Sequence, residues 1–573
     1  MEWLEWGEAA FDEARARRAP TLLLVHARWC RFCRDLRERV LVDERVVDAL
    51  RRDFVCIAVE RDDRPDLAAR YSRGGWPTLA FLDEHGELFA ADGFLEVDEL
   101  LARLALVAGY WAEQRASVHE RSQSHSALGE RGAVARAELN AELLEQHARW
   151  LCASADPVHG GWGSPHKFAH PQSLEYSLLR WSHSGDELMR KLVLRTLCNM
   201  QSGEIHDRVE GGFYRCATAQ DWSGPHHAKL LNANAEWLRA YAGAFQALKE
   251  QSFRGTAEST LAWLLDTILD RRTGAFGSSQ LADPLHAHLR TREARAAHGA
   301  PECDASVYAD GNALAASALF AAGDALGKPD CAEHALRALE FVLQELYDPQ
   351  HGVLHGWRGA ARPPILLRDQ SLTLAAILDA FEHTGRARYL AFATELASLT
   401  VERLASEEGG FWDLRLDPRA HGALRRRRRS LADNARMAQG LLRLSFMTLE
   451  PRWHSIAKAT LESFAGEFQR HGHAASTFAQ AAHLLLEDTV HVLIVGEPEH
   501  DDTRALQRAA LTSCVGQRIV QLVPPSEAAT LARFELPTGS ERAQAYVRCG
   551  SRPTSMTAAP ERLPSLLTRL EYV

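Results

Sequence analysis

Cysteine is scarce in this sequence, with 10 in 573 residues, so a scaffold built from closely spaced disulfides is excluded. Long apolar runs are also lacking: no stretch approaches the roughly 18 apolar residues that cross a bilayer. The first residues include acids where a signal peptide needs an apolar segment. We therefore expect a protein of the reducing cytoplasm that has no membrane partner.

An excess of positive charge is lacking too. Lys and Arg number 66 against 76 Asp and Glu, a net charge of -10, so no nucleic-acid partner is expected. Hydrophobic residues make up 46% and charged residues 25%, which excludes a disordered chain. The length predicts several domains, which we place at 1–112, 132–487 and 488–573, with a polar linker over 113–131.

Strand and helix signals alternate over the first hundred residues. Two glycines and Trp76-Pro77 precede the third predicted strand. The predicted elements are a helix over 6–17, strands over 21–26, 54–59, 79–82 and 88–90, and a helix from 34 onward. This order predicts a βαβββα module of an α/β domain.

Cys30 and Cys33 form the one closely spaced cysteine pair, placed where a strand passes into a helix. A cysteine in the first turn of a helix lies near unpaired N–H groups and the positive end of the helix dipole, which favour the thiolate. Arg31 and Arg34 add charge of the same helpful sign. Cys33 lies one turn further on and can resolve a mixed disulfide formed at Cys30. The spacing therefore suits thiol-disulfide exchange.

Two alternatives to redox chemistry remain open for this pair, namely half of a zinc site and two structural thiols. Zinc needs about four ligands, and no second C-x-x-C occurs in the chain, so we expect no metal and no cofactor. The charged stretch 60–66 alternates in sign after a strand, which predicts a solvated loop rather than a carboxylate metal site.

Helical periodicity dominates from the linker to about residue 487, as in the predicted helix over 226–249. Glycine followed by an aromatic or apolar residue recurs between the helices, and an Asp precedes four of these breaks. The six breaks begin at Gly160, Gly211, Gly274, Gly352, Gly409 and, more faintly, Gly472. Each interval has room for two helices and two connections, so each break marks one helical hairpin. Six hairpins predict a closed (α/α)6 toroid; an open solenoid is the alternative.

The C-terminal part shows strands over 492–496, 519–523 and 545–547 and helices over 502–511 and 561–570. This order predicts a small parallel α/β unit. It has no phosphate-binding glycine motif, so we interpret it as structural packing for the ring. Five consecutive arginines at 425–429 are compatible with phosphate or RNA binding, but a run between helices is usually a solvated loop.

Several segments resemble a known family. EWLEWGEAAFDEAR, WCRFC, AVERDDRPDL and GGWPTLAFLD are similar to the N-terminal domain of the YyaL/spermatogenesis-associated protein 20 family of thioredoxin domain-containing proteins. The resemblance implies a thioredoxin-like fold in which Pro77 adopts the cis form beside the cysteines. Trp29, Trp76 and Pro77 are then expected to bind the substrate. Leu24 stands where thioredoxins carry a buried acid, so the usual helper of proton transfer is missing.

The resemblance extends to the central part, which is similar to six-hairpin glycosidases and to the N-acylglucosamine 2-epimerase group in segments such as GGWGSPHKFAHP and EIHDRVEGGFYRCATAQDWSGPHHAKLL. It implies sugar chemistry at the loop end of the ring. Candidate acid and base groups are Asp207, His226, Lys229, Asp283, Asp369 and Asp413, and candidate stacking residues are Trp162, Trp222, Phe213 and Trp412.

Each of these candidates has a structural alternative. An Asp in a loop often caps a helix or closes a turn, the aromatics are often core, and a capping or packing role also suits His166, His170, His226 and His227. The family's usual residues are replaced at Tyr308 to Asn312 and at His227 and Ala228, so the ring's reaction is expected to be lost or changed.

Three functions follow from the sequence. The first is a thiol-disulfide oxidoreductase that acts on a protein or small-molecule disulfide or thiol, with the ring selecting the substrate. The second is a carbohydrate-active enzyme, an epimerase, isomerase or glycoside hydrolase, with the redox module accessory and a sugar bound in the ring. The third is a non-enzymatic binding scaffold. We favour the first.

Overall fold

The computed structural model describes residues 2–129, 136–163, 166–168, 170–357, 364–513, 517–537 and 542–571. The chain divides into two compact units. Unit 1 consists of Met1–Ala133, Leu354–Leu366 and Trp412–Arg428, and unit 2 of Val134–Val353, Leu367–Phe411 and Arg429–Val573. Two short segments from the helical part of the sequence therefore belong to unit 1. We call Leu354–Leu366 and Trp412–Arg428 the strap segments.

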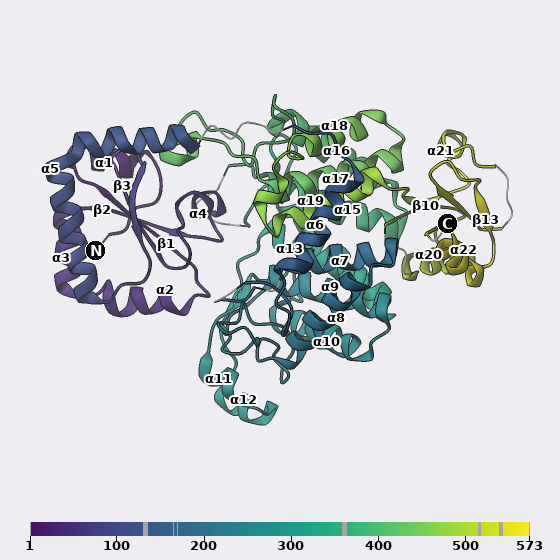
Figure 1. Ribbon diagram of the computed structural model, residues 1–573, viewed down its shortest axis with the longest axis horizontal. Helices are drawn as coiled ribbons and strands as arrows, with labels where there is room; N and C mark the ends of the chain where they lie inside the picture. Colours follow the sequence, from purple (N-terminus) through teal and green to yellow (C-terminus); the bar gives the residue numbers. More distant parts are fainter. Residues whose placement is uncertain are drawn as a thin grey trace. The chain divides into compact units, whose positions relative to one another are not determined.

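Unit 1 is built on a four-stranded mixed sheet (Figure 1). Its strands in spatial order are β2 (Val55–Glu60), β1 (Thr21–His26), β3 (Thr78–Leu82) and β4 (Leu88–Asp92). Strands β1 and β2 are parallel, and the two other pairs are antiparallel. The helices are α1 (Glu8–Arg17), α2 (Arg31–Asp35), α3 (Glu44–Asp53), α4 (Pro65–Tyr71) and α5 (Val97–Gly129), and the π-helix η1 (Leu36–Val40) continues α2.

Alternating side chains of β1 divide the core of unit 1 into two layers. Leu22 and Leu24 pack with η1, α3 and α5 on one face of the sheet. Leu23 and Val25 pack with α1, α4 and both strap segments on the other. The expected α/β domain is confirmed.

Unit 1 differs from the sequence prediction in two elements. Helix α4 lies between the second and third strands, so the observed order is βαβαββα rather than βαβββα. The expected linker over 113–131 is helical as far as Gly129, because α5 continues through it with a kink at Gln114; residues 130 and 131 lie outside the described part.

The charged stretch 60–66 is not a solvated loop. Glu60, Arg64 and Asp66 are 6%, 8% and 3% exposed. Arg64 forms two hydrogen bonds to Asp66, of 2.9 and 2.8 Å, because Pro65 starts α4 and turns both side chains onto one another. Charge alternation therefore marked a buried ion pair here.

Arg70 of α4 holds the second strap segment. Its buried guanidinium donates to the Asp413 carboxylate at 2.9 Å and to the carbonyls of Ala423 and Arg426, both at 3.0 Å. The neighbouring Tyr71 hydroxyl accepts the Ala423 N–H at 2.8 Å and donates to the Gly86 carbonyl at 2.7 Å. One turn of α4 thus satisfies the backbone of this irregular segment.

The arginine run is likewise occupied by protein partners. Arg426 makes a bidentate pair with Glu87, at 2.6 and 2.7 Å, and the Arg427 guanidinium lies 4.5 Å from the centre of the Trp412 ring. Arg428 donates to the Ala69 carbonyl at 3.0 Å. The expected solvated loop is therefore wrong for Arg426 and Arg427, because buried acceptors and a ring of unit 1 take up their charges.

Unit 2 contains a closed ring of six inner helices. Each inner helix packs against the next, and α19 returns to α7. The inner helices are α7 (Pro171–Ser184), α9 (Leu231–Leu248), α13 (Ala309–Leu326), α15 (Leu367–Thr384), α17 (Leu431–Thr448) and α19 (Ala474–Leu486). The outer helices are α6 (Ala141–Ser154), α8 (Glu187–Ser202), α10 (Gln251–Trp263), α14 (Asp330–Glu345), α16 (Ala387–Leu404) and α18 (Pro451–Glu462). The predicted (α/α)6 toroid is confirmed, and the open solenoid is excluded by its closure.

A recurring side-chain amide explains the glycine breaks. Asn434 in the first turn of α17 accepts the Phe411 N–H at 2.6 Å and donates to the carbonyls of Phe411 and Ser430, both at 2.9 Å. Gly410 must be glycine, because its φ is +71° and a Cβ there would lie 2.6 Å from the Asn434 Oδ1. The same pairing joins Asn234 to Phe213, Asn312 to Phe276 and Gln370 to Val353. Each loop is therefore tied to the inner helix that follows it.

The predicted helix over 226–249 begins only at Leu231. The residues before it form β5 (Lys229–Leu230), which pairs with β6 (Ser279–Gln280), and β6 pairs with β7 (Cys303–Asp304). A smaller hairpin joins β8 (Tyr347–Asp348) to β9 (Gly352–Val353). These short sheets stiffen the long loops between outer and inner helices.

The C-terminal part of unit 2 is a mixed sheet, not a parallel one. Strand β10 (Val490–Val495) is parallel to β11 (Arg518–Val523) but antiparallel to β12 (Gln544–Cys549), which pairs antiparallel with β13 (Ser555–Thr557). The helices are α20 (Asp501–Thr512), α21 (Ala528–Arg533) and α22 (Leu563–Glu571). Strand order and pairing directions repeat those of the unit 1 sheet. The sequence prediction missed α21 and β13, which are short and have weak periodicity.

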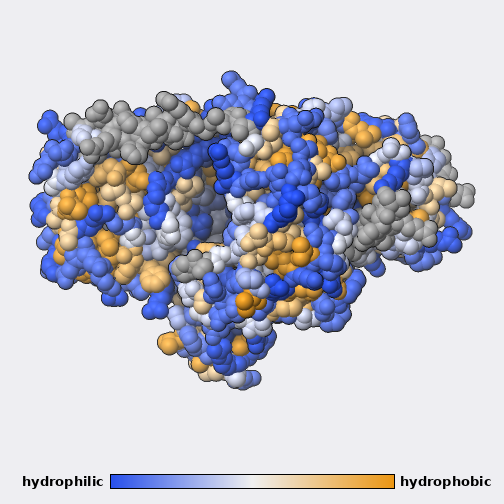
Figure 2. All heavy atoms as spheres, in the orientation of Figure 1, coloured by the Kyte–Doolittle hydropathy of each residue, from blue (hydrophilic) through white to orange (hydrophobic). Residues whose placement is uncertain are grey.

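Within the described residues, no helix combines the length and the apolar character needed to cross a lipid bilayer. Figure 2 shows a surface in which hydrophilic residues predominate and apolar side chains form separate small patches.

We predict that Arg70→Met loosens the second strap segment. Removing one partner of a buried ion pair costs about 3 kcal/mol, and the Ala423 and Arg426 carbonyls lose a donor as well. Trypsin should therefore cleave within 425–428 at least about tenfold faster, measured by mass spectrometry of timed digests. The control is Arg73→Met, since Arg73 is exposed and lies two residues after the end of α4. Equal cleavage rates for Arg70→Met and wild type would show that Arg70 does not hold the second strap segment in place.

We predict that Asn434→Ala lowers the free energy of unfolding of the helical unit by about 2 to 4 kcal/mol, because buried backbone groups of Phe411 lose their partner. Denaturant unfolding followed by far-ultraviolet circular dichroism measures this change. Gln344→Ala, at an exposed position on α14, should change it by less than about 0.5 kcal/mol. A similarly small effect of Asn434→Ala would show that the loops hold without the amide.

Candidate active site

Cys30 and Cys33 lie together at the start of α2. Cys30 is the N-cap residue and is 8% exposed, whereas Cys33 lies within the helix and is 1% exposed. The Cys30 thiol donates to the Trp76 carbonyl at 3.6 Å, and the Cys33 sulfur accepts the Ala27 N–H at 3.4 Å. None of the nine cysteines that the structure describes takes part in a disulfide.

The two thiols differ in their surroundings. A hydrogen bond with Cys30, together with burial, raises the pKa of the Cys33 thiol well above its ordinary value. Cys33 therefore keeps its proton at neutral pH. The roles that the sequence predicts, with Cys30 as the attacking sulfur and Cys33 as the resolving one, stay predictions.

The rim of this site is aromatic. The Trp76–Pro77 peptide bond is cis, in agreement with the expectation for Pro77. The Arg61 guanidinium lies 5.7 Å from the centre of the Trp29 ring and 5.3 Å from that of Trp76, so it bridges the two rings. The Trp29 Nε1–H donates to Asp62 at 2.8 Å, which fixes that ring. Phe32, between the cysteines, is 47% exposed. A partly apolar surface thus surrounds Cys30.

Glu60 is a buried acid that the sequence prediction did not connect with the cysteines. Its carboxylate accepts the N–H groups of Arg28 at 3.2 Å, Asp62 at 2.5 Å and Asp63 at 2.8 Å. Burial, reinforced by the neighbouring charge of Asp62, raises the pKa of Glu60 to about 8. The sequence prediction followed the thioredoxin pattern, in which the buried acid stands at the position of Leu24. The available signal was that Glu60 ends the strand that pairs with the strand before the motif.

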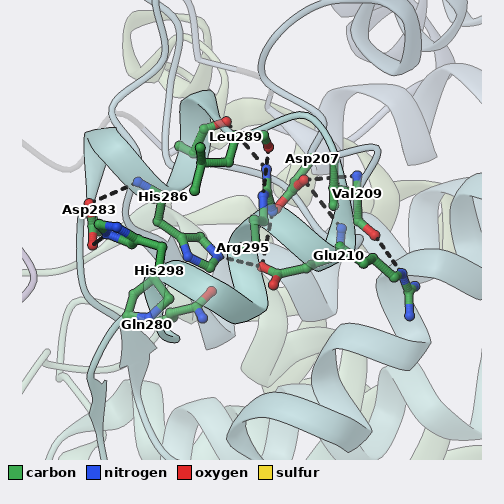
Figure 3. Close-up of polar contacts among 12 residues, drawn as sticks. Asp207, Val209, Glu210, Gln280, Asp283, His286, Leu289, Arg295 and His298 are labelled. Atoms are coloured by element: carbon green, nitrogen blue, oxygen red, sulfur yellow. Dashed lines mark hydrogen bonds and ion pairs between the residues drawn. The ribbon is translucent and has the colours of Figure 1, made fainter.

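Asp207 and Lys229 meet in a buried ion-pair network in unit 2. Figure 3 shows Asp207, Glu210 and Arg295 of this network. The Asp207 carboxylate accepts Lys229 Nζ at 2.7 Å and Arg295 Nη1 at 2.6 Å. Burial alone would raise the pKa of Asp207, but Lys229 and Arg295 together lower it far below its ordinary value. Arg295 also pairs with Glu210 at 3.0 Å, and Glu210 with His286 at 3.0 Å. Since neighbours satisfy these charges, the network ties the loop after α8 to α12 (Arg292–His298) and to the helix before it.

Asp283 has the capping role that was its structural alternative. It is the N-cap of α11 (Pro284–His288), accepts the His286 N–H at 3.0 Å and pairs with His298 at 3.1 Å (Figure 3). Its side chain thereby starts the short helix that carries His286 into the Asp207 network.

The remaining candidate acids and bases occupy separate places. Asp369 is fully buried in the first turn of α15. Asp413 belongs to unit 1 and pairs with Arg70, and burial raises its pKa despite that pair. His226 lies in the loop before β5, where burial lowers its pKa. His166 packs edge-on against His226, with ring centres 5.9 Å apart.

The candidate stacking residues of unit 2 lie in its interior. Trp162, Trp222 and Phe213 are 1%, 0% and 0% exposed. The Trp162 indole donates to the Leu151 carbonyl at 3.1 Å and that of Trp222 to the His159 carbonyl at 3.0 Å. Trp412 belongs to the second strap segment and carries Arg427 over its ring. All four rings thus have protein partners.

The candidate histidines of these loops also pack against rings. His170 is the N-cap of α7 and stacks on His473 with ring centres 3.7 Å apart. His227 lies against Tyr214 and His288, at 5.1 and 5.5 Å.

A polar cluster on the inner helices was missed by the sequence prediction. Asp310 of α13 accepts Arg368 Nε of α15 at 2.8 Å and Asn232 Nδ2 of α9 at 3.2 Å. Glu236 of α9 binds Gln172 of α7 and lies 3.8 Å from Arg436 of α17. The sequence analysis named none of these side chains as a candidate site residue.

Glu236 and Arg436 also line a cavity of about 440 Å³ within the ring. Burial raises the pKa of Glu236, although Arg436 opposes the shift. The size falls within the range of ligand sites, and the lining is polar on several helices.

Solved structures similar to the chain include a sugar epimerase from a ruminal bacterium, with a TM-score of 0.46, 12% identity, and coverage of 56% of this chain and 86% of that chain. A glycoside hydrolase family 76 mannosidase from Bacteroides thetaiotaomicron has a TM-score of 0.44, 11% identity, and coverage of 60% of this chain and 98% of that chain.

Residues 1–128 match the family model Thioredox_DsbH, described as a protein of unknown function, DUF255. Spermatogenesis-associated protein 20 of Homo sapiens is 28% identical over 311 residues, which cover 49% of this chain and 39% of the human protein. That of Rattus norvegicus is 22% identical over 676 residues, which cover 93% of this chain and 84% of the rat protein. The predicted resemblance is therefore confirmed: residues 1–128 match this family model, and the chain is similar to spermatogenesis-associated protein 20 of Rattus norvegicus along most of its length.

Proposed function

We propose that unit 1 is a thiol-disulfide oxidoreductase that reduces a disulfide in a protein or small molecule. The Cys30 thiolate attacks one sulfur of the substrate, and the first substrate thiolate leaves and takes up a proton. Cys33 then loses its proton and attacks Cys30, so that a Cys30–Cys33 disulfide forms and the second substrate thiol is released. Two electrons pass from the two cysteines to the substrate, and a dithiol reductant restores the reduced form.

The observation that carries this proposal is the hydrogen bond between Cys30 and Cys33, whose side chains differ in burial. The more exposed sulfur, Cys30, lies beside the Trp76 carbonyl, and the more buried one, Cys33, keeps its proton. Exposed Phe32 and the aromatic rim suit an extended or partly apolar substrate. A reducing compartment such as the cytoplasm fits this direction of electron flow.

We further propose that the ring of unit 2 selects the substrate. Its polar central cavity supports this role, since Glu236 and Arg436 offer both an acceptor and a donor to a ligand.

We predict that Cys30→Ser abolishes reduction of a protein disulfide such as that of insulin, because the attacking sulfur is lost. Cys33→Ser should instead accumulate a mixed disulfide at Cys30, visible as a mass adduct that a dithiol removes. Cys198→Ser, at an exposed cysteine on α8, should leave turnover unchanged. Undiminished turnover by Cys30→Ser would refute the oxidoreductase proposal.

A second candidate function is acid-base chemistry on a sugar in the ring, favoured by the buried Glu236 beside a cavity. We predict that a bound mono- or disaccharide raises the melting temperature in a concentration-dependent way, because a ligand held only by the folded state stabilises it. Glu236→Gln should remove that shift, whereas Glu258→Gln on α10 should not. The absence of any shift across a panel of neutral and acidic sugars would exclude this function.

A further inference from the structure

The carboxyl group of Glu60 lies on the face of the unit 1 sheet that the motif helix covers. Leu24 of β1 and Cys56 of β2 pack on this face with Leu36 and Val40 of η1, which continues α2. Because side chains alternate along a strand, Glu60, four residues after Cys56, points to the same face. His26, two residues after Leu24, does so too and is the register partner of Glu60.

Glu60 and Cys33 are bound by consecutive backbone amides. The Ala27 N–H donates to Cys33 Sγ at 3.4 Å, and the Arg28 N–H donates to Glu60 Oε1 at 3.2 Å. One short segment, between β1 and the motif, therefore holds both side chains. The Glu60 charge is also among the causes that raise the pKa of the Cys33 thiol, so the two side chains interact beneath the motif.

We propose that Glu60 is the proton acceptor of the resolving step. Its carboxylate takes the proton from Cys33 Sγ as that sulfur attacks Cys30 Sγ in the mixed disulfide. The bond between Cys30 and the substrate sulfur breaks, the Cys30–Cys33 bond forms, and the substrate thiolate leaves. The proton then passes from Glu60 to the leaving thiolate or to solvent. This role rests on the proposed oxidoreductase function. Glu60 would supply the acid that thioredoxins carry at the position of Leu24.

The charges around Glu60 suit a proton acceptor. Arg28 lies 3.8 Å from its carboxylate, while Asp62 and Asp63 follow it in the chain and oppose ionisation. The resulting pKa of about 8 exceeds that of an ordinary carboxyl, so Glu60 is a stronger base than usual. The ionised fraction grows as the pH rises through this value, and the resolving rate should grow with it.

His26 is the competing candidate on the same face. Its Nδ1 is buried and finds no hydrogen-bond partner among the described residues. Burial and the charges of Arg37 and Arg28 lower the pKa of His26 to about 4, so the imidazole is neutral but weakly basic. A weak base takes a proton from a thiol less readily than Glu60 does.

A single-turnover experiment tests the proposal. The reduced full chain is mixed with dithiodipyridine, an aromatic disulfide that releases one thiopyridone when Cys30 attacks and a second when Cys33 resolves. The chain with both motif cysteines changed to serine gives the background from other thiols. We expect Glu60→Gln to leave the first release unchanged and to slow the second on the order of 10- to 100-fold at pH 7.

The pH profile and two further variants distinguish a base from a structural support. The second release in wild type should rise and level off near pH 8, and Glu60→Gln should lose this levelling. Glu60→Asp should recover part of the rate, and Glu38→Gln, at an exposed position on η1, should match wild type. An unchanged second release in Glu60→Gln, or a loss confined to His26→Gln, overturns the assignment. If wild type itself shows no release above background, the oxidoreductase proposal fails instead.

Discussion

The pairing of one side-chain amide with the backbone of one loop is the constraint on which the helical unit depends. Asn234, Asn312, Gln370 and Asn434 each satisfy the N–H and C=O of the residue that follows a glycine break. Buried backbone groups without a partner are costly, so these amides allow long irregular loops to end in the interior. At Gly352 and Gly410 the glycine is needed because a Cβ would lie 2.5 Å from the Gln370 Oε1 and 2.6 Å from the Asn434 Oδ1. The repeat is thus a device for closing hairpins into a ring.

The buried Cys30, Cys33 and Glu60 side chains also have hydrogen-bond partners, and here the burial changes proton affinities. Backbone N–H groups between β1 and α2 and after β2 hold Cys33 and Glu60, while the Trp76 carbonyl accepts the Cys30 thiol. Burial keeps Cys33 protonated and makes Glu60 a stronger base than an exposed carboxyl. Burial and hydrogen bonds that hold the fold therefore also shift the proton affinities of Cys33 and Glu60.

Many polar residues that resembled catalytic groups serve the architecture. Asp207 and Lys229 form an ion pair in a buried network, Asp283 caps α11, and Asp413 forms an ion pair with Arg70. In each case the protein already supplies the partner that a substrate would otherwise provide. Glu236 and Arg436, which come from helices distant in sequence, line the ring's cavity and also pair with one another.

The sequence by itself determined the C-x-x-C motif, the strand before it, the six helical hairpins and the similarity to spermatogenesis-associated protein 20. These are local patterns of spacing and periodicity. It could not determine that the Arg28 N–H binds Glu60, that Arg64 and Asp66 are buried, or that Glu87 binds Arg426. Each of these depends on residues brought together from distant segments. The direction of β12 was misjudged for the same reason, since pairing direction is set by the connection and not by the strand's own residues. Only the tertiary structure decided which charges are paired, and pairing separates a structural acid from a reactive one.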